Sequence, residues 1–395
     1  MKKKADIELI IFIFSILFLP KIGLIDLKMI ASIIFLGISL ARDKRLVLEG
    51  KMVFSVLIIG LLIVLFIVNS LLNDTDYLIL MRYIRCLLSV VCVSNYIRTK
   101  KTTDNEVVQA VSIVIALHAI AIIVSVLFPA SRPAIEFISR YNKKYLSLRS
   151  TGLLSGYDFA GMFLNSAFTL RIIYNVKEKN KIFDTYCYLY IIATIFTSRL
   201  NTLLLMVEVV VVVLYMLKTQ RISSSVSLII IIPIMLAGSV FSILTIQAFA
   251  SIKVQLVQHY QWIAKLDRTI NLTYSDSSVL YDIIESHYDI APEINRIIGN
   301  GITVNKDPGI IKTIYEGGCV AVVLKFLFYL DIFTYSLRRK RAQYIYVFLL
   351  IYILLNTIYE FKLQFYFATG AFELLITFFT VGRHEELQSS QEVVI

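Results

Sequence analysis

Residues 52–72 read MVFSVLIIGLLIVLFIVNSLL, an apolar run without an acidic or basic residue. An α-helix rises about 1.5 Å per residue, so about 20 apolar residues cross a hydrocarbon core of about 30 Å. The run is continuous and does not alternate between apolar and polar residues, which excludes the pattern of a membrane β-barrel strand. The stretch therefore predicts a transmembrane helix.

The composition of the whole chain agrees with this prediction. Of its 395 residues, 58% are hydrophobic and 17% are charged, and the mean hydropathy is +0.76. Soluble domains are roughly 45–50% apolar and about 25% charged. The composition therefore excludes a water-soluble enzyme, a disordered scaffold and a secreted disulfide protein. The four cysteines lie inside apolar runs without CxxC spacing, so we expect no disulfide framework and no metal site.

The apolar runs predict an all-α polytopic membrane protein with about twelve transmembrane helices, as a single integral domain over residues 1–395. The first run lacks a small-residue cleavage site, so we expect a retained span and not a signal peptide. Pro20 and Gly23 predict a tight hairpin between the first two spans. The expected spans are 6–19, 23–40, 52–72, 78–97, 107–128, 153–174, 183–199, 201–217, 225–246, 311–337, 343–359 and 364–380.

The basic residues between the spans predict the orientation. They occur on alternate connections and so share one side of the membrane, and lysine and arginine accumulate on the cytoplasmic side. Both termini are therefore expected in the cytoplasm. Topology also explains the net charge of +11, so nucleic acid is not an expected partner. The basic groups are Lys2–Lys4, Arg42–Arg45, Arg98–Lys101, Lys177–Lys181, Lys218–Arg221 and Arg338–Arg341.

Two external connections differ from the rest. A basic loop, residues 129–151, carries positive charge on the side where the topology rule disfavours it. A much longer loop, residues 247–310, joins the ninth and tenth spans and mixes aromatic with apolar residues. Loops beyond about 12–15 residues in compact proteins are usually functional or disordered. We expect the long loop to form a partly helical cap on the external face, with an amphipathic helix over residues 277–284.

Two segments near the basic loop have residue types that suit an anion. Residues 140–149 interleave cations with tyrosines, and a guanidinium matches phosphate oxygens; simple lipid head-group binding is the alternative. Gly152 and Gly156 then flank a helix start, where unpaired N–H groups favour an anion. Asp158 follows inside the apolar segment, where a carboxylate is costly without a partner. The alternative for Asp158 is a charge that stabilises the helix N-terminus.

Two later segments repeat this combination of charge and small residues. Residues 197–201 place Arg199 at the membrane edge, where it either binds a ligand or extends to the head groups. After the long loop come Gly299-Asn-Gly301, Asp307-Pro-Gly309 and Glu316-Gly-Gly318. A lone Gly-x-Gly is a weak motif, and glycines in a membrane helix also allow close helix packing.

Charged residues also lie near the middle of the predicted spans, where ionisable groups are functional candidates or form pairs. Lys325 is one of them, and either Glu208 or Glu373 is available to pair with it. The sequence does not choose between these two glutamates.

Taken in order, these segments resemble the O-antigen polymerase and ligase family, and the Wzy-type bacterial polysaccharide polymerases in particular. The resemblance covers about residues 110–380, and it depends on the order of degenerate motifs. The ligase branch typically has a histidine near the end of the long loop, whereas residues 303–307 contain none, which favours a polymerase. The matching positions are Arg149 with Gly152, Ser198–Arg199, Gly299/Gly301, Asp307/Gly309 and Glu316/Gly318.

The resemblance implies a fold like that of the type C glycosyltransferases, with one large external loop between the ninth and tenth helices. It also implies a metal-independent transferase without a cofactor. Its substrate would be a polyprenyl-pyrophosphate-linked oligosaccharide in the lipid bilayer, elongated on the outer side of the bacterial inner membrane. A chain-length regulator and a flippase are the expected partners.

The implied chemistry assigns roles to residues. Cations would stabilise the pyrophosphate leaving group, and a carboxylate or imidazole would accept or orient the proton of the acceptor hydroxyl. The pyrophosphate-binding candidates are Arg149, Arg199, Arg140 and Arg296. The catalytic candidates, which the sequence does not rank, are Asp158, Asp307, Glu316 and His287. Structural roles are expected for Gly152, Gly299, Gly301 and Gly309.

Two other classes compete with a polymerase. A flippase for lipid-linked oligosaccharides would also have about twelve spans, but many transporters have repeated halves, and no repeat is visible here. A structural or sensor membrane protein would use the long loop to bind a partner, but this leaves the combination of cations and carboxylates unexplained.

Overall fold

The computed structural model describes residues 6–22, 25–46, 48, 50–73, 75–139, 149–179, 181–218, 288–304, 308–339 and 344–391. Its contacts divide the chain into two units. Unit 1 comprises Met1–Ile115, Leu170–Asp184 and Asp282–Ile395, and unit 2 comprises Ala116–Thr169 and Thr185–Tyr281. We describe each unit by itself. The amphipathic helix expected over 277–284 lies outside the described residues.

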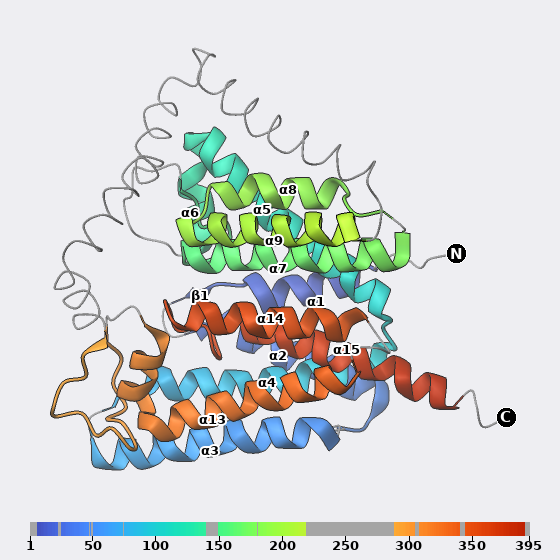
Figure 1. The fold of residues 1–395 in the computed structure, drawn as a ribbon. Coiled ribbons are helices and arrows are strands. Elements are labelled where there is room, and N and C mark those ends of the chain that lie inside the picture. Colours follow the sequence, from blue (N-terminus) through green and yellow to red (C-terminus); the bar gives the residue numbers. More distant parts are fainter. Residues whose placement is uncertain are drawn as a thin grey trace, which may run out of the picture. The chain divides into compact units, whose positions relative to one another are not determined.

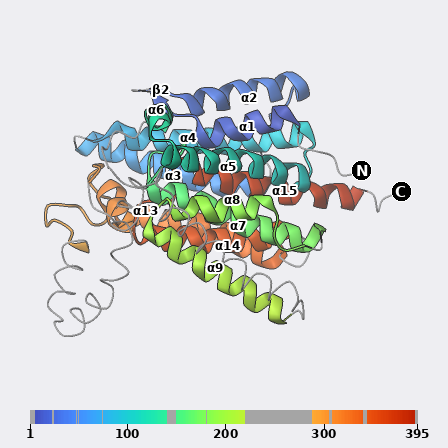
Figure 2. The same cartoon turned by 90° about the horizontal axis from the view of Figure 1, so that it is seen from above.

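Unit 1 is a helical bundle. In it α4 packs against α2, α3 and α15, and α13 packs against α3 and α14 (Figures 1 and 2). Its elements are α1 (Ile7–Phe18), β1 (Lys21–Ile22), β2 (Ile25–Asp26), α2 (Leu27–Asp43), α3 (Gly50–Leu72), α4 (Tyr77–Lys100), the start of α5 (Asp104–Leu127), the π-helical turn η2 (Asn175–Lys179), α13 (Gly309–Arg339), α14 (Tyr344–Glu360) and α15 (Ala371–Gln391).

Unit 2 contains the rest of α5 and most of α7, together with α8 and α9, which pack against each other. Within the predicted basic loop, a 3-10 turn and a short helix precede residue 140. The bounds are η1 (Pro129–Ser131), α6 (Arg132–Ser139), α7 (Tyr157–Tyr174), α8 (Thr185–Ile195) and α9 (Arg199–Lys218).

The helices identify an all-α membrane protein. Each predicted span overlaps a helix, apart from 225–246, which lies outside the described residues, and the largest difference is at the last span, 364–380, whose helix begins only at Ala371. Within the described part of the chain, four helices are long and apolar enough to cross a membrane, and shorter apolar helices accompany them. The four are Met52–Leu72, Tyr77–Lys100, Asp104–Leu127 and Gly309–Arg339. The total of twelve spans stays a prediction.

The tight hairpin predicted between the first two spans is confirmed. The strands β1 and β2 pair antiparallel, with Lys21 opposite Asp26 and Ile22 opposite Ile25. The Asp26 carboxylate then caps α2 by accepting a hydrogen bond from the Lys28 N–H at 3.0 Å. The hairpin therefore reverses the chain directly into the second helix.

One end of unit 1 joins the connections that were predicted to be cytoplasmic. Glu8, at the start of α1, is 2.9 Å from Arg42 and 2.8 Å from Lys100, and Arg98 forms an ion pair with Asp43. The start of α1 and the ends of α2 and α4 therefore lie together, as alternate connections require. Which side of the membrane this end faces stays a prediction.

The opposite end of α4 meets the last part of the predicted long loop. Asp76 is the N-cap residue of α4. The Asp76 N–H donates a hydrogen bond to the Gly301 carbonyl at 2.9 Å, and the Asp76 carboxylate accepts one from the Thr303 hydroxyl at 2.7 Å. The helix between the two ends has 24 residues. At about 1.5 Å per residue, they lie roughly 36 Å apart, close to the thickness of a bilayer.

Candidate functional site

Helix α13 is interrupted at two glycines. Gly317 and Gly318 have non-helical backbone angles, and φ of Gly318 is +64°. A Cβ atom on Gly318 would lie 2.2 Å from the carbonyl oxygen of Ile297. Only glycine combines this backbone conformation with so close an approach. The Glu316-Gly-Gly318 motif is therefore a break in a membrane helix.

The loop before α13 provides the hydrogen bonds that the break removes from the helix. Cys319 and Val320 donate their N–H groups to the carbonyls of Arg296 and Ile297, at 2.8 and 3.1 Å. In the opposite direction, Asn300 and Gly301 donate to the carbonyls of Tyr315 and Glu316, at 3.0 and 3.1 Å. Irregular backbone at membrane depth requires such internal partners, because lipid offers none.

The predicted glycine motifs are parts of one packed structure. Gly299 has φ +71°, and a Cβ atom there would lie 2.6 Å from the backbone nitrogen of Gly317. At Gly309, where α13 starts, a Cβ atom would lie 2.6 Å from both a Glu360 carboxylate oxygen and the Leu363 carbonyl. Gly299 therefore packs closely against the break at Gly317, and Gly309 packs closely against the segment that follows α14.

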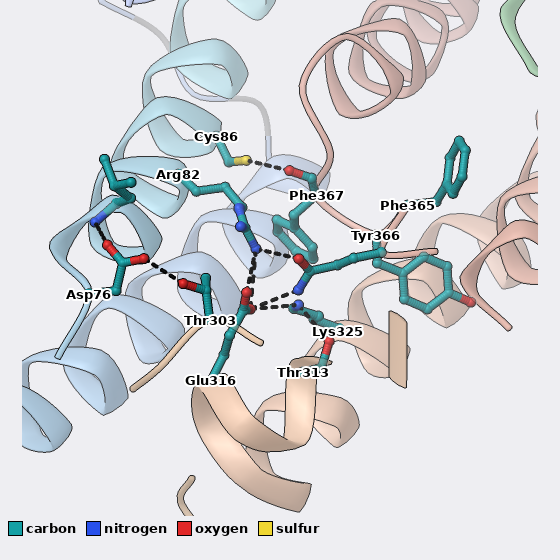
Figure 3. Close-up of polar contacts among 12 residues, drawn as sticks. Asp76, Arg82, Cys86, Thr303, Thr313, Glu316, Lys325, Phe365, Tyr366 and Phe367 are labelled. Carbon is teal, nitrogen blue, oxygen red and sulfur yellow. Dashed lines mark hydrogen bonds and ion pairs between the residues drawn. The ribbon is translucent and has the colours of Figure 1, made fainter. Parts of the chain in front are cut away.

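A buried carboxylate lies at this break. The side chain of Glu316 is 2% exposed, and its oxygens lie 2.9 and 3.2 Å from Nη1 of Arg82 on α4 (Figure 3). Gln364 Nε2 donates to the carboxylate at 2.7 Å, and Lys325 Nζ lies 3.7 Å from it. Lys325 also donates to the Thr313 hydroxyl at 2.9 Å. Two cations therefore share one carboxylate in the interior of an apolar bundle.

The pairing left open for Lys325 is corrected by the structure. Lys325 lies beside Glu316, and Glu373 pairs with Arg85, whose Nε is 3.2 Å from the carboxylate. Sequence spacing cannot show which helices are neighbours. Arg82 and Arg85 lie about one turn apart on α4, yet Arg82 pairs with Glu316 and Arg85 pairs with Glu373.

The segment between α14 and α15 is held by two more acids. Glu360 accepts hydrogen bonds from the N–H groups of Phe365 and Tyr366, at 2.6 and 2.7 Å. Glu373 accepts from the Gly370 N–H at 2.5 Å, and Arg85 donates to the Phe367 carbonyl at 3.1 Å. These charge-assisted bonds fix the backbone that carries Gln364 toward Arg82 and Glu316.

Unit 2 joins the other two predicted motifs. The Ser150 N–H donates to the Phe196 carbonyl at 2.8 Å, so the segment after Arg149 lies beside the turn that precedes Arg199. The Arg149 guanidinium lies 5.9 Å from the ring centre of Tyr157. The backbone carbonyl of Arg149 accepts a hydrogen bond from the Arg132 side chain at 2.6 Å.

Asn201 connects the turn to α7. Its Nδ2 donates to the Tyr157 carbonyl at 3.0 Å, and its own carbonyl accepts from Asn165 at 3.0 Å. Gly161 allows this packing, because a Cβ atom there would lie 1.9 Å from the Asn201 amide. The half-buried Asp158 lies in the first turn of the same helix.

The candidate residues thus fall into three groups. Unit 1 contains the buried Glu316, the exposed Arg296 and three of the glycines; unit 2 contains Arg149, Asp158 and Gly152, whose φ is +54°. For Arg199 the structure describes its place at the start of α9 but not its side chain. Outside the described residues lie Arg140, His287 and Asp307.

Sequence reasoning missed Arg82, Arg85 and Gln364. A signal was present for the two arginines, because both fall within the predicted span 78–97, where a charged residue requires a partner or a task. Their spacing of three also places them on one helix face. Gln364 carried no signal, since only the fold of residues 361–370 brings its amide to Glu316.

Within the described residues, no group of three or more His, Cys, Asp and Glu side chains is placed to hold a metal ion. The metal-independent chemistry implied by the resemblance stays a prediction. Comparisons of the chain with protein-family models, with curated proteins and with solved structures found no match.

Proposed function

We propose that this chain is a polysaccharide polymerase of the bacterial cell membrane. It would transfer a growing glycan from its polyprenyl-pyrophosphate carrier onto the terminal sugar of another lipid-linked repeat, on the outer side. The observation that carries the proposal is the contact between the two glycine motifs at the break of α13, with the buried Glu316 beside Arg82. The order of these motifs is the basis of the family resemblance, and their packing together supports a common role.

The proposed reaction exchanges one glycosidic bond for another. The bond between the anomeric carbon and the pyrophosphate oxygen breaks, and the acceptor hydroxyl oxygen bonds to that carbon. The hydroxyl proton passes to a carboxylate or imidazole, and polyprenyl pyrophosphate leaves. Negative charge grows on the leaving oxygen, so one preorganised donor is typically worth about 2.7–4 kcal/mol of barrier.

The positions of the described candidates support roles for some of them. Arg149 and Arg199 belong to adjoining segments of unit 2, which supports a shared role in binding the pyrophosphate, with Arg140 and Arg296 as further candidates. Both Glu316 oxygens are bonded to donors, so Glu316 suits positioning of cations better than proton transfer. Asp158, Asp307 and His287 remain the proposed proton acceptors.

The decisive test uses the surface glycan of a deletion strain. We expect a product capped with one repeat unit, because ligation and export continue without polymerisation. Total loss of the glycan would place the protein at an earlier step and overturn the proposal. Purified chain in liposomes with a short lipid-linked repeat should produce a ladder of longer glycans without added metal.

One observation favours a transporter as the second candidate. Transporters use discontinuous membrane helices at their binding sites, and α13 is discontinuous at Gly317. Against this, the break's backbone groups at residues 315, 316, 319 and 320 are already hydrogen-bonded to the 296–301 loop. In the liposome assay, translocation of the lipid-linked sugar without glycan extension would identify the transporter.

A further inference from the structure

The two arginines of α4 differ in how much of their hydrogen-bonding capacity the protein uses. Each nitrogen of the Arg85 guanidinium has a partner: Nε donates to Glu373, Nη2 donates to the Phe367 carbonyl, and Nη1 forms an ion pair with Asp26 at 3.9 Å, and the side chain is 7% exposed. Its position and partners indicate a purely structural role.

Arg82 is engaged on one nitrogen. Among the described residues, its acceptors are Glu316 and Gln364, and every one of these bonds leaves from Nη1, at 2.8–3.2 Å. A guanidinium carries five N–H donors, so the edge formed by Nε and Nη2 keeps donors that these residues do not use. The side chain is 23% exposed, three times the exposure of Arg85.

The surroundings hold that edge in place. Glu316 lies directly before the break of α13. Gln364 lies on the segment between α14 and α15, whose backbone N–H groups donate hydrogen bonds to Glu360 and Glu373. An arginine fixed by two partners on one nitrogen loses little further freedom when another group binds, which is the condition for a preorganised site.

Arg82 also lies within the apolar, membrane-spanning length of α4. It lies five residues after Tyr77, the first residue of α4, hence roughly 7–8 Å along the helix from the end that meets Gly301. A partly exposed cation at this depth of an apolar helix is a functional candidate. Lys325 shares the Glu316 carboxylate, so that carboxylate faces two cations.

We propose that the Nε/Nη2 edge of Arg82 binds a phosphate-bearing anion, with Glu316 and Gln364 as positioning residues. Two parallel N–H groups match two oxygens of one phosphate, an arrangement that lysine cannot reproduce. The identity of the anion rests on the proposed function: it is the diphosphate of a polyprenyl carrier.

The test measures binding to the purified full chain in nanodiscs, with undecaprenyl pyrophosphate and inorganic pyrophosphate as separate probes. Arg98 is the matched control, since it lies at the other end of the same helix and is paired with Asp43. We expect Arg82→Gln to weaken lipid binding at least tenfold and Arg82→Lys severalfold, while Arg98→Gln stays within twofold of wild type. Arg82→Lys keeps the charge beside Glu316, so it remains informative should Arg82→Gln not fold.

The outcomes separate the sources of the phosphate. Tighter binding of the lipid than of inorganic pyrophosphate, with the affinity for both probes lowered in the Arg82 variants, is the expected result. Arg82-dependent binding of inorganic pyrophosphate alone would overturn the carrier lipid as the ligand. Wild-type affinity for both probes in Arg82→Lys would overturn the site. Because the assay involves no catalysis, lost polymerisation with intact Arg82-dependent binding would count against the proposed polymerase and not against this site.

Discussion

At the scale of single residues, the buried charges explain why polar side chains persist in an apolar bundle. Glu316 is nearly inaccessible, yet Arg82, Gln364 and Lys325 all reach it. Burying one charge without a partner is far more costly than burying a hydrogen-bonded pair. The cluster is therefore stable as a unit, and its members contribute unequally.

Glu316→Gln should destabilise the protein more than Lys325→Met does. The first change leaves the buried Lys325 and the partly exposed Arg82 without the carboxylate they share, whereas the second preserves the Arg82–Glu316 pair at 2.9 Å. Breaking a buried pair typically costs about 3–5 kcal/mol. Thermal unfolding of both variants in the same detergent measures the order, and equal melting temperatures would contradict the shared-carboxylate arrangement.

Arg149→Ala and Arg199→Ala should each abolish long polymer while the protein still inserts into the membrane. Arg149→Lys and Arg199→Lys should also impair it, because lysine lacks the planar fork that binds two oxygens. Gel analysis of the surface glycan, with membrane abundance as the control, measures both effects. Full-length polysaccharide from both alanine variants would refute the assignment of these two residues.

At the scale of elements, the break in α13 brings the Gly299-Asn-Gly301 motif of the loop into contact with the Glu316-Gly-Gly318 motif of the helix. Gly318 allows the 296–301 loop to replace helical hydrogen bonds with its own. The same contact places Glu316 beside Asn69 of α3, whose Nδ2 donates to the Ile298 carbonyl at 2.6 Å. Loop, broken helix and neighbouring helix therefore depend on one another.

Gly318→Ala should disrupt this arrangement, and Gly60→Ala in α3 is the control. Alanine at position 318 meets the Ile297 carbonyl at 2.2 Å and also has an unfavourable positive φ, which alone costs roughly 1–2 kcal/mol. A Cβ atom on Gly60 has no neighbour within 4 Å, so that change should be neutral or stabilising by up to about 1 kcal/mol. Melting temperatures in detergent test the contrast, and similar values for both variants would argue against the break.

At the scale of the whole molecule, the ends of unit 1 have different chemistry. One end joins Glu8, Arg42 and Lys100 through ion pairs, and the other joins Asp76 to Gly301 and Thr303. A helical bundle of this length, with chemically different ends, is typical of a membrane protein whose two ends lie on opposite sides of the bilayer.

Labelling of single cysteines tests which end faces outward. In a chain whose four cysteines are replaced, Asn73→Cys should react with a membrane-impermeant maleimide on intact spheroplasts. Lys101→Cys, at the other end of α4, should react only after permeabilisation, because the positive-inside rule places it in the cytoplasm. The reverse pattern would invert the predicted topology and place the Gly301 loop inside the cell.

The sequence by itself determined the helical membrane class, the hairpin at Pro20 and nearly all helix positions, because hydrophobic length and turn chemistry are local properties. Only the tertiary structure decided that Lys325 meets Glu316, that Glu373 meets Arg85, and that the glycines at 299 and 318 touch. Every residue of an apolar helix is compatible with lipid, so hydropathy leaves its neighbours unspecified. Neighbours are chosen by side-chain packing and by the need of each buried charge for a partner, and both depend on how separate segments of the chain come together.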